Sequence, residues 1–120
     1  MVEIIDSTKE LKRITGMKMK KKDAQMILDY LEGHDYHLAN ENGKLVRIDM
    51  CDNYKSEEYS IDEVIDLVCE WNYELRTSAE ENLENAENKK QQKKIKKYIS
   101  GLLHDEKRLD NLFRKTCYAR

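Results

Sequence analysis

Two histidines and a cysteine lie close together near the middle of the chain and are the first candidates for a metal site. His34 and His37 are three residues apart, and Cys51 could approach them across a predicted hairpin. Imidazole and thiolate are ligands that zinc prefers, but a structural zinc needs four of them. The other cysteines and histidine show no spacing that would supply the missing ligand. They are Cys69, His104 and Cys117. We therefore expect no metal ion and no other cofactor.

Motifs for catalysis are absent from the sequence. It contains no glycine-rich phosphate loop, no Gly-x-Ser-x-Gly, no His-Glu-x-x-His and no paired catalytic carboxylate motif. The three cysteines are odd in number and widely spaced, which indicates neither a disulfide framework nor a Cys-x-x-Cys knuckle. We expect a protein with reduced thiols that is not an enzyme.

Carboxylates form the most prominent pattern. A helix that begins at Ser60 would place five of them within an arc of about 120 degrees, opposite its apolar residues. Like charges four residues apart each destabilise an isolated helix by about 0.2–0.5 kcal/mol, and the helix dipole favours only those in the first turn. Glu70 and Glu74 are therefore not explained by helix stability. We interpret the row as a partner-binding face, or else as a solvated or internally neutralised one. It comprises Asp62, Glu63, Asp66, Glu70 and Glu74, extended by Glu57 and Glu58.

A lysine block at 89–97 is the second charged candidate. On a helix these lysines would span almost the whole circumference, so only three or four could contact one phosphate backbone. The block lacks arginine and has one neighbouring aromatic residue, Tyr98, which argues against base readout. The alternative is a solubilising face paired with the preceding glutamates. The block comprises Lys89, Lys90, Lys93, Lys94, Lys96 and Lys97. A smaller cluster, expected to be a basic arm or a disordered linker, comprises Lys18, Lys20, Lys21 and Lys22.

Capping patterns and periodicity predict the elements of the first half. Ser7 and Glu10 form a capping-box pattern for a short helix that ends at Gly16. Apolar periodicity predicts a helix over 23–32, stopped by Gly33, and an Asn-Gly turn predicts a hairpin of strands 36–39 and 44–48. Ser60 begins the next helix, which either breaks near 76–78 or continues.

The C-terminal half is helix-favouring but mostly polar. Residues 78–97 would form a helix of about 30 Å, in which glutamates precede lysines as the helix dipole prefers. Beyond it, apolar residues near heptad spacing suit an antiparallel return onto the core or a homodimer contact, with interruptions at 100–101 and 105–106. They are Ile95, Tyr98, Ile99, Leu102, Leu109, Leu112 and Phe113.

The charges of the whole chain are segregated. The net charge of −2 over 120 residues combines +4 in residues 1–22, −8 in residues 49–75 and six lysines in residues 89–97. No apolar stretch approaches the roughly 18 residues of a membrane span, and no signal pattern begins the chain, so we expect a cytoplasmic protein. The expected fold is one predominantly helical α+β domain (1–120). It has a basic start (1–22), a central part (23–76) with one β-hairpin and the acidic helix, and a long charged helical region (77–120).

Small size, absent catalytic motifs and segregated charge suggest an interaction protein. We expect an inhibitor or adaptor whose acidic helix binds the basic groove of a nucleic-acid-handling protein as a phosphate-backbone decoy. Residues with AT-rich codons (Lys, Asn, Tyr, Ile) suggest a phage or mobile element, and hence an anti-CRISPR or other anti-defence role in the host bacterial cytoplasm. The alternative is an accessory nucleic-acid-binding protein that uses Lys89 to Lys97, with homodimer formation left open.

Overall fold

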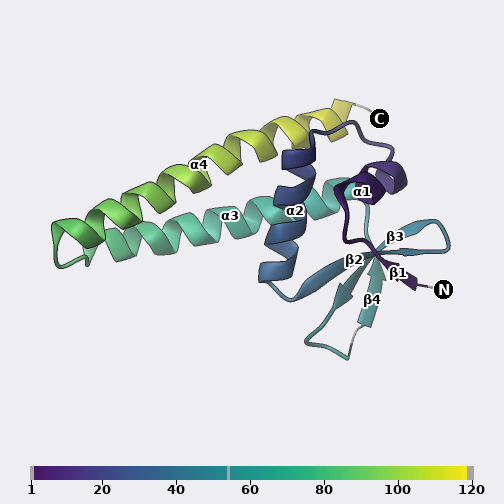
Figure 1. Ribbon diagram of the computed structural model, residues 1–120, viewed down its shortest axis with the longest axis horizontal. Coiled ribbons are helices and arrows are strands. Elements are labelled where there is room, and N and C mark those ends of the chain that lie inside the picture. Colours follow the sequence, from purple (N-terminus) through teal and green to yellow (C-terminus); the bar gives the residue numbers. More distant parts are fainter. Residues whose placement is uncertain (1, 54, 119–120) are drawn as a thin grey trace.

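The computed structural model describes residues 2–53 and 55–118, with side chains placed for residues 3–53 and 55–115 (Figure 1). Within these residues the chain forms four helices and one four-stranded antiparallel sheet. In chain order the elements are β1 (Val2–Ile4), α1 (Thr8–Thr15), α2 (Lys21–Gly33), β2 (Tyr36–Glu41), β3 (Lys44–Asp49), β4 (Lys55–Glu58), α3 (Ile61–Glu84) and α4 (Lys89–Tyr118). The predicted α+β class with mostly helical content is confirmed.

The predicted hairpin is present as β2 and β3. Its turn consists of Asn42 and Gly43, whose φ angles of 55° and 87° are those that a two-residue hairpin turn requires. The hairpin is the centre of a larger sheet of order β1-β2-β3-β4, so the prediction of a lone hairpin was wrong. β1 has three residues, and β4 is exposed throughout and lacks apolar residues. Neither strand therefore carries the pattern from which strands are predicted.

α2 begins two residues before its predicted start. Lys21 and Lys22 lie in its first turn, so the expectation of a disordered linker was wrong for these two lysines. At the other end Gly33 is the last helical residue rather than the stop. The left-handed backbone falls instead on Asp35 (φ 60°), a residue type that tolerates it.

α3 and α4 form a long antiparallel helical hairpin that extends well beyond the sheet (Figure 1). α3 runs unbroken through 76–78, and the chain reverses at residues 85–88. A continuous helix over 78–97 was therefore a wrong prediction. Asn85 Nδ2 donates to the Glu81 carbonyl (3.1 Å), and Asn88 Oδ1 accepts from the Gln91 amide (2.9 Å), so one asparagine lies at each helix end. The apolar seam is interrupted at 100–101 and 105–106, and α4 runs through both positions.

The core lies where the sheet meets the helices. Leu38 and Leu45 from the central strands are buried with Leu11 of α1, Ile27 of α2 and Val68 of α3. The last turns of α4 reach the same core and contribute Leu109 and Leu112. α3 and α4 are therefore anchored at one end by the core, while their other end projects away from it (Figure 1).

A stack of rings fixes the first half of α3 on the sheet. The His34 ring lies parallel to Trp71 at 4.0 Å between centroids, and Tyr36 lies on Trp71 at 5.7 Å. The Arg47 guanidinium then sits between Tyr36 (4.3 Å) and Tyr59 (4.5 Å). A cation over an aromatic face contributes about 0.5–2 kcal/mol, so this stack holds sheet and helix in one arrangement.

Candidate functional site

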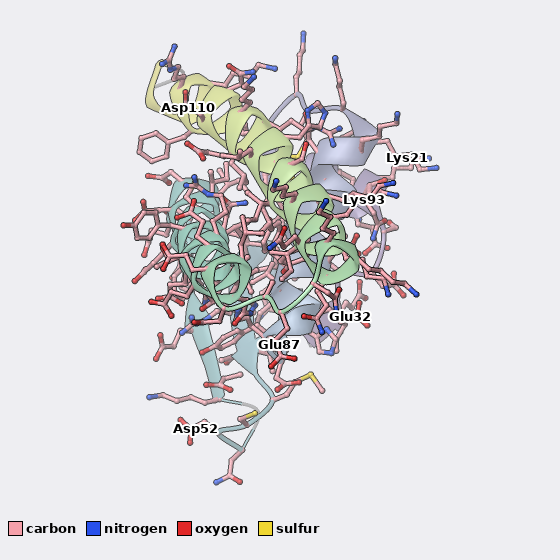
Figure 2. The ribbon with its side chains drawn as sticks, turned by 90° about the vertical axis from the view of Figure 1, so that its left-hand side faces the viewer. Lys21, Glu32, Asp52, Glu87, Lys93 and Asp110 are labelled. Atoms are coloured by element: carbon pink, nitrogen blue, oxygen red, sulfur yellow. The ribbon has the colours of Figure 1, made fainter. Side chains whose placement is uncertain are left out.

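α3 presents a row of carboxylates on the side away from the core. Asp66, Glu70 and Glu74 are exposed and recur every four residues, which is about 6 Å along a helix axis. Asp62, at the start of the row, is half-buried. Figure 2 looks along the helical hairpin and shows many oxygen-tipped side chains on the outward side of α3.

The row is longer than predicted because α3 does not break. Glu81 and Glu84 are exposed, and helix periodicity places them on the same side. Sequence analysis did not include them because it left open a helix break near 76–78. The available signal was their spacing: Glu81 follows Glu74 by seven residues and Glu84 follows Glu70 by fourteen, which places each pair on one side of an unbroken helix. From Asp62 to Glu84 the row covers about 33 Å of helix. We name it the acidic face: Asp62, Asp66, Glu70, Glu74, Glu81 and Glu84.

Most of the acidic face is electrostatically unpaired within the chain. Asp66, Glu70 and Glu74 have no ion pair within 4.0 Å to any other described side chain. Packing alone therefore does not account for the charge of these residues, which is available to a partner.

The other predicted acidic residues have local roles. Glu57 pairs with Arg47 (3.6 Å) and Lys55 (3.5 Å), and Glu58 lies 4.0 Å from Lys44. Glu63 closes the capping box, because its Oε1 accepts from the Ser60 amide (3.3 Å) and hydroxyl (2.8 Å). These three carboxylates therefore support the sheet edge and the helix start.

A buried polar network fixes α3 against its neighbours. Asn72, 1% exposed, donates through Nδ2 to the Tyr30 hydroxyl and to the Leu102 carbonyl, both at 2.9 Å. The Tyr30 hydroxyl donates to Asp105 at 3.0 Å. Arg76 donates to Asn72 Oδ1 (3.2 Å) and pairs with Glu106 at 2.8 Å, which adds a second link from α3 to α4. The acidic face therefore stands on a helix that is held on its inner side by α2 and α4.

A hollow of about 260 Å³ opens beside the acidic face, between α3 and α4. It is lined by Asp66 and Cys69 from one helix and by Glu106, Asp110 and Phe113 from the other, among other residues. Burial, followed by the nearby carboxylates of Asp66, Asp110 and Glu106, raises the pKa of the Cys69 thiol. The thiol is thus held protonated, which does not suit a nucleophile or a metal ligand.

The lysine block lies at the start of α4, where its charge opposes the helix dipole. We predicted one helix whose dipole would favour glutamates before lysines, and this prediction was wrong. The turn at 85–88 places the glutamates at the end of α3 and the lysines at the start of α4. The lysines form no ion pair with the other described side chains, so the predicted pairing with those glutamates is absent there. All six are exposed: Lys89, Lys90, Lys93, Lys94, Lys96 and Lys97.

The histidines and cysteines do not converge. Among the described residues, no group of three His, Cys, Asp or Glu side chains is arranged to hold a metal ion. His34 is part of the aromatic stack, and its Nδ1 lies 2.9 Å from the Tyr30 carbonyl. The Cys51 thiol lies 3.6 Å from Asp35, whose charge raises the pKa of that thiol. The side chain of Cys117 lies outside the described residues.

The predicted apolar seam of α4 packs mainly within the chain. Leu102, Leu109 and Leu112 are buried, whereas Tyr98 (50%) and Phe113 (37%) remain exposed. The antiparallel return thus uses the centre of the seam, while a homodimer through the exposed ends stays a prediction. No helix in residues 2–53 and 55–118 combines the length and apolar character needed to cross a membrane.

Comparisons with protein families, with curated proteins and with solved structures found no match to this chain.

Proposed function

We propose that this protein is a non-enzymatic inhibitor, encoded by a phage or mobile element, whose acidic face binds the basic nucleic-acid-binding surface of a partner protein. The observation that carries the proposal is the exposed, unpaired row of Asp66, Glu70 and Glu74 on one firmly anchored helix. Such a row competes with a phosphate backbone for the same cationic groove. An anti-CRISPR or other anti-defence role fits this mode of action.

Three properties of the acidic face support this proposal. The helix is ordered before binding, so association does not have to pay for folding it. The row is about 33 Å long, with a gap of about two turns between Glu74 and Glu81, and this length suits an elongated groove rather than a small pocket. Asp66, Glu70 and Glu74 form no ion pair with the other described side chains, and therefore their charge can steer the encounter with a cationic partner.

The test is DNA cleavage by a panel of RNA-guided nucleases in the presence of this protein. We expect at least one nuclease to be inhibited, and an excess of the cleavable substrate DNA to relieve the inhibition. The E70K/E74K variant replaces attraction by repulsion at the centre of the row. We expect it to inhibit the nuclease at least tenfold more weakly than the wild type, which corresponds to a loss of about 1.4 kcal/mol in binding free energy.

A matched variant separates a local effect from a change in net charge. Glu32 and Glu87 are exposed and lie off the outward side of α3 (Figure 2). E32K/E87K changes the net charge equally and should retain inhibition within about twofold. Equal losses in the two variants, or no inhibition by the wild-type chain across the panel, would contradict the proposal.

A further inference from the structure

The two lysine clusters, far apart in the sequence, lie on the same side of the folded molecule. Figure 2 shows Lys21 and Lys93 on the side opposite to Asp110 and to the outward side of α3. Lys21 and Lys22, in the first turn of α2, line a hollow of about 450 Å³ together with Asp105 and Arg108 of α4. The fold thus brings the basic N-terminal segment against the helix that carries the lysine block.

A second hollow continues the first along α4. It has a volume of about 510 Å³ and is lined by Lys94, Lys97, Tyr98, Gly101 and Leu102. Both hollows are lined by Asp105, so they adjoin each other along α4. We name the two hollows together the basic groove.

Positive charge dominates the basic groove. Its lysines form no ion pair with other described side chains: Lys21, Lys22, Lys94 and Lys97. Arg108 is already engaged, because its Nε lies 2.8 Å from Asp23. Two carboxylates also line the basic groove. Asp29 accepts a hydrogen bond from Gln25 (2.9 Å), and Asp105 accepts one from Tyr30 (3.0 Å).

An exposed aromatic ring lies among these lysines. Tyr98 is 50% exposed, and Gly101, one turn further along α4, leaves open space beside it. Stacking of a base on an aromatic ring, together with lysines that follow the backbone, is how proteins bind single strands without reading their sequence. A duplex offers no free base face to Tyr98.

We propose that the basic groove binds single-stranded nucleic acid, with its phosphates along Lys94 and Lys97 and toward Lys21 and Lys22, and with one base stacked on Tyr98. This inference does not depend on the acidic face, which lies on another side of the molecule. DNA and RNA share the chemistry involved, so a preference for the sugar is not part of the proposal.

The test is fluorescence anisotropy of labelled oligothymidylate, oligouridylate and a duplex of equal length, titrated with the full chain over a range of salt concentrations. We expect both single strands to bind more tightly than the duplex. For single strands each phosphate contact contributes about 0.7 to the slope of log K against log salt. Losing two contacts in K94Q/K97Q should therefore weaken binding about 25-fold at 0.1 M salt.

The matched control removes two lysines outside the basic groove. Lys9 of α1 and Lys107 of α4 are exposed and do not line it, so K9Q/K107Q should change binding by less than about twofold. Y98A should weaken single-strand binding roughly tenfold, and Y98F should restore it, because the ring alone stacks.

Three results would overturn the proposal. The first is the absence of single-strand binding even at low salt. The second is equal weakening by K94Q/K97Q and K9Q/K107Q, which would mean diffuse attraction to the whole chain. The third is tighter binding of the duplex, which would assign the lysines to double-stranded nucleic acid. Circular dichroism melting of each variant identifies any loss that arises from unfolding.

Discussion

Asn72 is the residue through which α2, α3 and α4 are held together. It is buried and hydrogen-bonded to Tyr30, Leu102 and Arg76. A buried polar group that loses its partner costs about 1–3 kcal/mol, so alternative packings of the three helices are penalised. This role could not be predicted from the sequence, because a lone asparagine in an amphipathic helix is most often a surface residue.

Tyr30 makes this network dependent on pH in the alkaline range. Burial raises its pKa from 10.0 to about 12, and Asp105 acts in the same direction, while the hydrogen bond from Asn72 opposes it. Between these two values the unfolded chain releases the proton and the folded chain keeps it. The contribution of Tyr30 to the free energy of unfolding is therefore complete below pH 10 and falls as the pH rises toward 12.

Urea unfolding of the wild type and Y30F at several pH values measures this contribution. The Y30F variant lacks the hydroxyl, so we expect its stability deficit to shrink between pH 10 and pH 12. A deficit that stays constant over this interval would show that the hydroxyl titrates normally in the folded chain.

At the scale of elements, helices and turns that are specified by neighbouring residues could be predicted from the sequence, whereas strands that depend on distant partners could not. The capping box of Ser60 and Glu63 and the turn at Asn42 and Gly43 were recognised because their residues are neighbours in the sequence. β1 and β4 were missed because their stability comes from pairing with β2 and β3. The turn at 85–88 was missed because its asparagines lie within a uniformly polar, helix-favouring stretch.

Asn88 is predicted to define the start of α4. Its side chain accepts from the Gln91 amide, and loss of such a cap costs about 1 kcal/mol. N88A should therefore lower the free energy of unfolding by about that amount. N88D should retain wild-type stability or exceed it, because a carboxylate at this end also favours the dipole. Urea titrations followed by circular dichroism give both values, and an N88A variant as stable as the wild type would contradict this role.

At the scale of the whole molecule, the fold turns charge blocks along the sequence into charge faces in space. The acidic residues of the middle block and of the segment before the turn align on α3. The lysines of the two basic segments line adjoining hollows over α2 and α4. Sequence analysis located the blocks and the acidic row, but it could not show that Lys21 and Lys94 lie in one groove, because that depends on how α2 crosses the hairpin (Figure 1).

The most direct test of the central claim is an NMR titration of the isotope-labelled chain with a short arginine-rich peptide. The acidic face should be the site of contact, so the amide shifts should concentrate on α3 around Asp66, Glu70 and Glu74. They should disappear in E70K/E74K and persist in E32K/E87K. Shifts that centre on Glu57 and Glu58 of the sheet edge, or that spread evenly over all exposed carboxylates, would contradict the account.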